Sequence, residues 1–403
     1  MIRILQIIGS LERGGAETFL INLYKHIDRN KVQFDFAIYH EPSENSYYQE
    51  VIEMGGRVFI LPHKSNGMLT NFRAVQKLIR DNDYKMVWRY AGSCFEAIDL
   101  LTAKLAGASE TVLNSRCSHT DGMQVLIHYI MKPFSPIFAK KLAEKFAGAS
   151  ETALNSGYSH TDGMRMLIHY IVKPFLPLFV TKNFACGIMA GKWMFGRRPF
   201  EVINNGIEVE KFRYDEEVRN QNRKKFGLQD KIVVGHVGRF HPVKNHKLII
   251  DVYEKFRQEV PRSALVLVGT GELLAQIQEL VKEKELENDV LFLGSRSDVP
   301  EMLQMMDIFI MPSLFEGFPR AFLEAQAAGL PCVASSTISR EVDVTGNVCF
   351  VDLDAPVAVW AERIVEKCGS KTEDNTEKLK AAGYDIKDVA KRVEAYMLEM
   401  IES

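Results

Sequence analysis

Short β-branched segments alternate with amphipathic segments along this chain, and the alternation begins twice. The first series opens with IRILQII, AETFLINLYKHI and QFDFAIY, and the second opens with KIVVGHVGRF at 231–240. Such alternation predicts parallel strands whose connecting helices cover both faces of a sheet. We therefore expect an α/β chain of two doubly wound domains that face each other across a cleft, where the carboxyl ends of the strands form the default ligand site.

A charged segment without a strand predicts the boundary between the two domains. At 403 residues the chain is long enough for two domains. The segment IEVEKFRYDEEVRNQNRKKFGLQ, 207–229, separates the two series of strands. We therefore predict a first domain over 1–207, a second over 208–385, and a C-terminal helix over 386–403 that packs back towards the first domain.

One segment of the first domain occurs twice. Residues 104–139 recur at 145–180 with an offset of 41 residues, and 26 of the 36 aligned positions are identical. Because repeat architectures need roughly three or more units, two copies indicate a local tandem duplication of one strand–helix unit. The sequence leaves open which copy takes the place of a single unit, and whether the duplication is natural.

Charge and cysteine content exclude several classes of protein. The formal net charge of −2 gives no electrostatic reason to expect a nucleic-acid partner. The six cysteines include no CxxC pair, which favours reduced thiols and a cytoplasmic location. The N-terminus is apolar for only about eight residues, as in a buried first strand rather than a signal peptide. No long apolar run predicts a membrane span.

Two loops combine glycine or basic residues with a predicted strand end. Gly14 and Gly15 precede a helix, where an anion can approach backbone N–H groups; a tight turn without a ligand is the alternative. In the second domain, Arg239 and Lys244 follow the strand KIVVGHV. A guanidinium and an ammonium at the carboxyl end of a strand suit a diphosphate, whereas isolated surface charges are the alternative.

Two glutamates, Glu316 and Glu324, lie on either side of a Gly-Phe-Pro segment. Glu316 is predicted to lie in a loop beyond a strand end, and Glu324 about one turn into the following helix. The backbone between them is predicted to supply N–H groups at a helix N-terminus. Two such acceptors suit a sugar ring and a nucleotide ribose, whereas a capping or solvent-facing role would fit Glu324 alone.

Other turns and acidic pairs are weaker signals. The glycine turns at 268–272 and 293–296 suit either loops around a nucleotide or plain strand–helix turns. The acidic pairs at 81–83 and 352–354 resemble carboxylate clamps, but neither follows a convincing strand end. We therefore expect no metal ion in the site.

Taken together, these motifs resemble those of the retaining GT-B glycosyltransferases of the large family-four type. The pattern E-x7-E at 316–324 continues into EAQAAGLPCVAS. The other matching motifs are Gly14–Glu17, VINNGIE, HVGRFHPVKNH, LVLVGTGEL and LFLGSRSDVPEML, in the family's order. The resemblance covers nearly the whole chain and is nearest to bacterial exopolysaccharide and capsule biosynthesis enzymes. It implies two Rossmann-like domains, the first on the acceptor side and the second binding the nucleotide sugar.

The resemblance also implies a role for each matching residue. Glu316 would lie beside the donor sugar as a catalytic residue, and Glu324 would accept hydrogen bonds from the ribose. Arg239 and Lys244 would hold the donor diphosphate. The other implied donor-binding residues are Gly15 at the diphosphate, Arg296 at the base, and Gly317, Phe318 and Pro319 in the loop.

This family also places a histidine after a strand of the first domain, close to the donor sugar. The duplication supplies that histidine twice, as His119 and His160. His160 is slightly favoured because its copy continues into NFACGIMAGKWMFG, as the family's single unit does. His119 is nearly as good, because AIDLLTAKLAGA precedes it in the family's manner. Both are therefore candidate catalytic residues.

The activity implied is transfer of a sugar from a nucleotide diphosphate, most simply a UDP-sugar, to a glycan or lipid-linked acceptor. The family retains the anomeric configuration and generally needs neither a metal nor another cofactor. One alternative is a nucleotide-sugar epimerase or a phosphorylase, which share two facing Rossmann-like halves. The other is a catalytically inactive nucleotide-sugar-binding subunit of a polysaccharide assembly complex.

Both copies of the duplicated unit carry the pattern LIHYI-x-KPF-x-P. The pattern is apolar and aromatic, with Lys132 or Lys173 among the apolar residues. It predicts a peripheral contact with the inner face of the membrane, near a lipid-linked acceptor. The alternative is that these segments simply cover the sheet.

Overall fold

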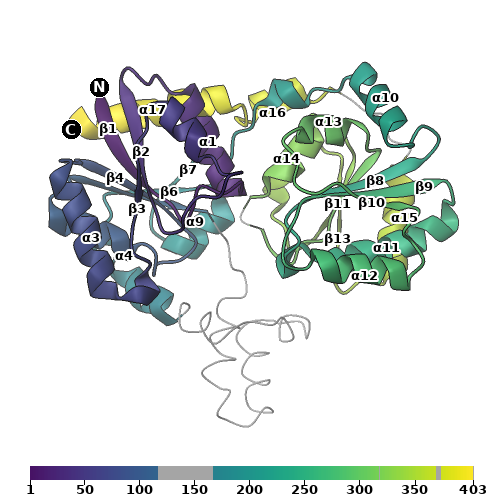
Figure 1. Ribbon diagram of the computed structural model, residues 1–403, viewed down its shortest axis with the longest axis horizontal. Helices are drawn as coiled ribbons and strands as arrows, with labels where there is room; N and C mark the ends of the chain where they lie inside the picture. Colours follow the sequence, from purple (N-terminus) through teal and green to yellow (C-terminus); the bar gives the residue numbers. More distant parts are fainter. Residues whose placement is uncertain (117–166, 317, 369–373, 403) are drawn as a thin grey trace, which may run out of the picture. The chain divides into compact units, whose positions relative to one another are not determined.

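The computed structural model divides into two compact units, each built on one sheet (Figure 1). Unit 1 comprises Met1–Asn205 together with Lys387–Ser403, and unit 2 comprises Gly206–Ile386. The structure describes residues 1–116, 167–316, 318–368 and 374–402. No helix in these ranges is long and apolar enough to cross a bilayer.

Unit 1 contains a seven-stranded sheet and the helices around it. Its strands are β1 Ile2–Ile7, β2 Val32–Ile38, β3 Val58–Ile60, β4 Met86–Ala91, β5 Glu110–Ser115, β6 Lys182–Ala185 and β7 Glu201–Val202. Its α-helices are α1 Gly15–His26, α2 Tyr48–Glu53, α3 Met68–Asp81, α4 Ile98–Ala106, α9 Ile188–Phe195 and α17 Ile386–Glu402. Its 3-10 helices are η1 Lys64–Asn66 and η2 Lys173–Leu178.

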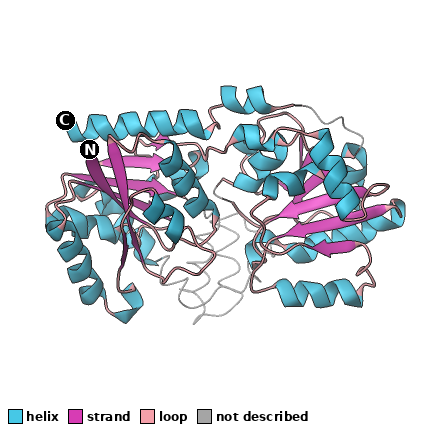
Figure 2. Cartoon of the chain, turned by 45° about the horizontal axis from the view of Figure 1, so that its top comes forward, coloured by secondary structure: helices cyan, strands magenta, loops and turns pink. Residues whose placement is uncertain are grey.

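Unit 2 contains a six-stranded sheet with helices on both of its faces (Figure 2). Its strands are β8 Ile232–Val237, β9 Ser263–Val268, β10 Val290–Phe292, β11 Ile308–Met311, β12 Cys332–Ser335 and β13 Val348–Val351. Its α-helices are α10 Glu216–Lys225, α11 His246–Glu259, α12 Leu274–Glu283, α13 Val299–Gln304, α14 Arg320–Ala327, α15 Val357–Lys367 and α16 Thr376–Ala381. Its 3-10 helices are η3 Val209–Phe212, η4 Pro242–Lys244 and η5 Arg340–Val342.

The strand pairings confirm the predicted doubly wound fold. The strand order is β3-β2-β1-β4-β5-β6-β7 in unit 1 and β10-β9-β8-β11-β12-β13 in unit 2. Neighbouring strands are parallel in both sheets. The direction of winding reverses between β1 and β4, and again between β8 and β11. In a sheet of this kind, ligands bind outside the carboxyl ends of the strands at that reversal.

Burial on both faces explains why the central strands are predominantly apolar. Every residue of β2, β4 and β9 is buried. On one face of the unit 2 sheet, the core is closed by Ile250 and Phe256 of α11, Ile277 of α12 and Trp360 of α15. The sequence pattern therefore predicted the right class of sheet for a physical reason.

In unit 1, the structure describes one part of each copy of the duplicated segment. Strand β5 belongs to the first copy and pairs with β4 and β6, whereas 167–178 belongs to the second copy. Thr111 Oγ1 of β5 donates to the carbonyl of Phe179 at 2.8 Å. The Cys94 N–H donates to His169 Nδ1 at 3.1 Å, and the His169 ring stacks on Trp193 at 4.1 Å. The intervening 117–166 lie outside the described residues.

The C-terminal helix α17 packs on unit 1. The Asp28 N–H donates to Glu394 Oε2 at 2.6 Å. The Tyr396 ring lies 5.4 Å from that of Phe184 in β6. These contacts hold the C-terminal helix on unit 1.

Candidate functional site

Two loops meet at the winding reversal of unit 2, where the fold places a ligand site. One follows β8 and covers 238–245, and the other follows β11 and is described over 312–316 and 318–319. The Leu314 N–H donates to the Val243 carbonyl at 2.8 Å, so the loops are tied through their backbones. Because the two loops are fixed to each other, the side chains that they carry have a defined mutual geometry.

The glycine turns after β8 and β9 have a packing reason of their own. A Cβ on Gly269 would lie 2.0 Å from the Gly238 carbonyl oxygen, and one on Gly271 would lie 2.4 Å from the Phe240 oxygen. Both glycines also have positive φ, at 140° and 157°. A Cβ on Gly238 would lie 2.6 Å from His236 Nε2. Gly269 and Gly271 are therefore required by the close contact of the two turns, whether or not a nucleotide binds beside them.

Lys244 and Glu316 form an ion pair between the two loops. Lys244 Nζ lies 2.5 Å from Glu316 Oε1, although 72 residues separate them in sequence. Their side chains are 21% and 13% exposed. The structure thus brings together the residue predicted to hold the diphosphate and the residue predicted to lie beside the sugar. Gly317, the next predicted residue, lies outside the described residues.

Glu324 and the start of α14 follow Glu316 in the sequence. Arg320 Nη2 donates to Glu324 Oε1 at 2.8 Å, and both side chains are largely buried. Pro319 is the N-cap of α14, and since proline has no N–H it cannot donate to an anion as predicted for this loop. The buried Phe318 ring stacks on Tyr384 at 5.3 Å, so its side chain helps to anchor the loop.

The two remaining predicted arginines differ in their surroundings. Arg239 is exposed, and within the described ranges its guanidinium forms no hydrogen bond or ion pair. Arg296 Nη2 lies 2.5 Å from Asp298 Oδ2, and this hydrogen bond raises the pKa of Arg296. Arg239 is therefore available to a ligand as it stands, whereas Arg296 would have to share its guanidinium with Asp298.

Two buried histidines lie beneath the loop that carries Lys244. The His236 ring lies 5.0 Å from that of His246, which stacks on Phe240 at 4.0 Å. His236 Nδ1 donates to the Ile310 carbonyl at 2.8 Å. Burial lowers the pKa of His246 to about 4 and that of His236 well below its usual value. Both rings are therefore uncharged near neutral pH and add no positive charge to the site.

In unit 1, the predicted glycine and histidines have different standing. Helix α1 begins at Gly15, and a Cβ built on Gly15 would meet nothing within 4 Å. The fold itself therefore does not require glycine there, and the role of Gly15 at the diphosphate stays a prediction. His119 and His160 lie outside the described residues.

No acidic pair forms a metal site in the part of the chain that the structure describes. Asp81 pairs with Lys77 at 2.5 Å, and Asp352 accepts a hydrogen bond from Ser336. No group of three or more His, Cys, Asp or Glu side chains that could hold a metal ion occurs in those ranges. Metal independence stays a prediction.

A buried ion network that sequence reasoning missed lies at the carboxyl edge of the unit 1 sheet. Asp99 Oδ1 lies 2.9 Å from Lys64 Nζ, and its Oδ2 lies 2.9 Å from Arg89 Nε and accepts from Tyr39 at 2.7 Å. Asp99 is 1% exposed. Burial lowers the pKa of Lys64. Burial also acts to lower the pKa of Arg89, but the negative charges of Asp99 and Glu96 outweigh it, so the pKa of Arg89 is raised.

The network is structural, because its donors are already used. Besides Asp99, Lys64 Nζ reaches the carbonyls of Phe95 and Glu96 at 3.5 and 3.4 Å. Tyr39 follows β2 directly, and Lys64 follows β3. Polar side chains just beyond apolar strands were the signal that could have revealed the network.

Comparison with known proteins identifies the family of the chain. Residues 218–347 match the family described as "Glycosyl transferases group 1". EpsF of Bacillus subtilis (strain 168), which its name assigns to the glycosyltransferases, is 32% identical over 397 residues, covering 95% of this chain and 93% of that protein. The chain belongs to the group 1 glycosyltransferases. This confirms the resemblance to bacterial polysaccharide glycosyltransferases.

Two further likenesses extend the comparison. This glycosyltransferase also resembles the "UDP-Gal:alpha-D-GlcNAc-diphosphoundecaprenol alpha-1,3-galactosyltransferase" of Escherichia coli. The two are 36% identical over 154 residues, which cover 37% of this chain and 38% of that enzyme. The crystal structure of Anabaena HepE with UDP-glucose covers 99% of this chain and 100% of its own, with a TM-score of 0.72 and 19% identity. At that identity the likeness shows the fold, which is the predicted GT-B class.

Proposed function

We propose that this glycosyltransferase moves a hexose from a UDP-sugar to a glycan or lipid-linked acceptor, with retention, in the synthesis of an exopolysaccharide or capsule. The observation that carries the proposal is the Lys244–Glu316 pair at the winding reversal of unit 2. It holds a cation for a diphosphate and a carboxylate for a sugar side by side. Two likenesses support the donor class: HepE was solved with UDP and with UDP-glucose, and the Escherichia coli relative is named for UDP-Gal.

The pair also accounts for the charge changes that the reaction requires. When the bond between the anomeric carbon and the diphosphate breaks, its electrons stay on the departing oxygen. Lys244 and the exposed Arg239 stabilise that negative charge without a metal ion. As the phosphate oxygens take over the ammonium of Lys244, Glu316 is released from this ion pair. Its carboxylate then faces the positive charge developing on the sugar, while the acceptor hydroxyl adds to the anomeric carbon and gives its proton to the departing phosphate oxygen.

Replacing Lys244 by alanine is expected to weaken UDP binding by about 2–3 kcal/mol, the size of a charge-assisted hydrogen bond. Isothermal titration calorimetry of the full chain with UDP measures this. Lys247→Ala is the matched control, because Lys247 is 72% exposed and pairs with Asp251 on the surface of α11. It should leave the affinity unchanged. Equal losses in the two variants would show that Lys244 does not hold the nucleotide.

The same titration with UDP and a donor-hydrolysis assay test whether the protein works without a metal ion. Both are expected to proceed unchanged in excess EDTA, since Lys244 and Arg239 take the place of a cation at the diphosphate. If chelation abolishes turnover and magnesium restores it, the metal-free proposal is wrong.

The proposal includes a peripheral contact at the inner face of the membrane, through the segment 167–178. Ile171, Phe175 and Leu178 are 56%, 55% and 73% exposed, so large apolar side chains stand in solvent along it. Lys173, the lysine of this segment, does not face outwards. It donates to the Trp193 carbonyl, and burial lowers its pKa. Lys132, in the other copy, lies outside the described residues.

The chain is therefore expected to float with anionic liposomes in a density gradient, and Phe175→Ser with Leu178→Ser is expected to abolish flotation. Apolar side chains entering the interfacial region supply the binding free energy. Val365→Ser, at a 40% exposed position on α15 of unit 2, is the control. Wild-type protein that stays at the bottom of the gradient contradicts the membrane contact.

A further inference from the structure

Arg320 holds Glu324 by one end only. Its Nη2 donates to Glu324 Oε1 at 2.8 Å, across one turn of α14. Its Nη1 is buried and has no hydrogen-bond partner among the described residues. No described group donates to the second carboxylate oxygen of Glu324. The pair therefore keeps one unused donor and one unused acceptor.

Both unused groups belong to side chains that are almost out of contact with solvent. The Arg320 and Glu324 side chains are 10% and 11% exposed. A guanidinium and a carboxylate usually meet through two parallel hydrogen bonds, and a buried polar atom without a partner is costly. An Nη1 without a partner at this depth therefore indicates that a further group accepts from it in the working protein, next to the second oxygen of Glu324.

A vicinal diol has the chemistry that fits these two groups. One hydroxyl can donate its proton to the free oxygen of Glu324, and its neighbour can accept from Arg320 Nη1. The ribose of a nucleoside diphosphate carries such a diol on its 2′ and 3′ carbons. A phosphate could accept from Nη1 but would be repelled by the carboxylate, so a neutral diol fits better than an anion.

We propose that Arg320 positions Glu324 and, together with it, recognises the ribose diol of the donor nucleotide. Arg320 is thus a positioning and specificity residue that the motif comparison did not single out. It also balances charge, because it neutralises Glu324 while Lys244 neutralises Glu316. The approaching diphosphate then meets the exposed Arg239 rather than two bare carboxylates. This inference rests on the proposed function, in which the donor is a nucleotide sugar.

The test is the ratio of two affinities, measured by calorimetry with UDP and 2′-deoxy-UDP and repeated with GDP and 2′-deoxy-GDP. Wild-type protein is expected to prefer the ribonucleotide by about 10- to 100-fold, the effect of one hydrogen bond to a charged group. In Arg320→Leu the preference should fall to about 3-fold or less, because Glu324 is no longer held. Arg320→Lys keeps the charge without the planar fork and should recover only part of the preference.

Arg363→Leu is the matched control, since Arg363 pairs with Glu366 on the exposed surface of α15 in the same unit. It should keep the wild-type preference. Thermal unfolding of each variant shows whether it is folded, and Arg320→Lys preserves the test if Arg320→Leu is not. An unchanged preference in the folded Arg320 variants, or no preference in the wild type, overturns the role of Arg320 while nucleotide binding stands. If the wild type binds none of the four nucleotides, the proposed function itself fails, and this inference fails with it.

Discussion

Replacing Asp99 by alanine is expected to lower the free energy of unfolding of unit 1 by about 3–5 kcal/mol, because two buried cations would lose their shared carboxylate. Asp99 accepts from Lys64, Arg89 and Tyr39. Urea unfolding followed by tryptophan fluorescence measures the change. In a Trp360→Phe background the signal comes from unit 1 alone, because the two other tryptophans of the chain lie there.

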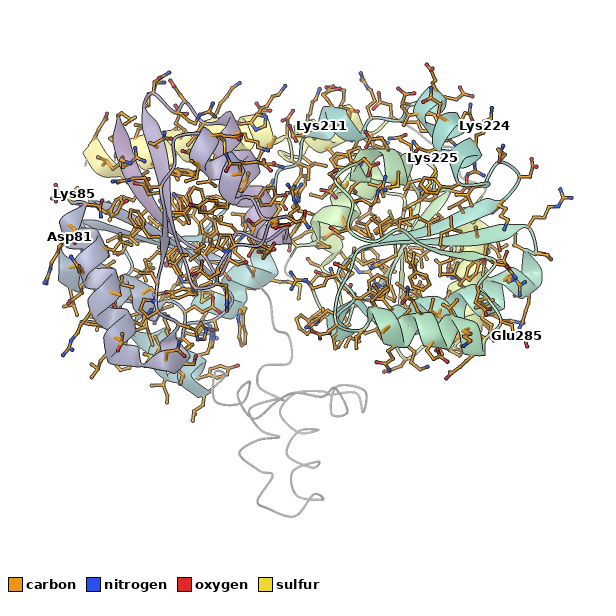
Figure 3. All side chains as sticks on the ribbon, in the orientation of Figure 1. Asp81, Lys85, Lys211, Lys224, Lys225 and Glu285 are labelled. Atoms are coloured by element: carbon orange, nitrogen blue, oxygen red, sulfur yellow. The ribbon has the colours of Figure 1, made fainter. Side chains whose placement is uncertain are left out.

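Two further variants make this prediction specific. Asp81→Ala removes a carboxylate that pairs with Lys77 on the surface of α3, where it is 53% exposed (Figure 3). It should cost no more than about 0.5 kcal/mol. Lys64→Met should cost less than Asp99→Ala, since Asp99 would keep Arg89 and Tyr39. If Asp99→Ala proves as mild as Asp81→Ala, the network does not hold the carboxyl edge of unit 1 together.

The fold could be predicted because its strands are buried on both faces. Strands such as β9 and β11 have no solvent-facing side, so they stand out as short apolar runs between amphipathic helices. Helix α14 was predicted from the residues at its two ends: Pro319 stands at its start, and a glycine follows shortly after its end. Local chemistry specifies these elements, and parallel strands with helical crossovers leave few ways to connect them.

The contacts within the candidate site were harder to predict. The positions of Lys244 and Glu316 after two different strands indicated that both lie at one edge of the sheet. Nothing in the sequence showed that they form an ion pair with each other, because that depends on how two loops pack. The Arg320–Glu324 pair has the spacing of neighbours on a helix and was visible in principle. The motif E-x7-E specifies the glutamate and leaves the identity of residue 320 open.

Because of the duplication, the sequence could not show which of the two histidines is functional, and the structure changes the expectation. Sequence comparison slightly favoured His160. In the structure, the strand in the sheet is β5 of the first copy, which ends at Ser115. His119 follows Ser115 by four residues, so at most about 14 Å of extended chain separates them. His160 has no such tie to the carboxyl end of β5. We therefore now expect His119 to be the functional histidine of the full chain.

A shortened chain converts this expectation into an exchange of roles. Deleting 117–157 removes 41 residues, the offset of the repeat, and joins Arg116 directly to Tyr158. One complete copy remains, and His160 then follows Ser115 by four residues, as His119 does in the full chain. Because the strand and the segment 167–178 that unit 1 uses are both kept, the shortened chain should unfold at the same urea concentration and turn over a nucleotide sugar at a similar rate.

His119→Ala in the full chain is expected to lower turnover by roughly 100-fold, as loss of a positioned polar group in a site commonly does, while His160→Ala changes it little. In the shortened chain, His160→Ala should produce that same loss. The same substitution would thus be silent in one chain and severe in the other, which a general effect on folding cannot imitate. A large loss from His160→Ala in the full chain, with His119→Ala silent, would instead assign the site to the second copy. Large losses from both would show that the two copies act together.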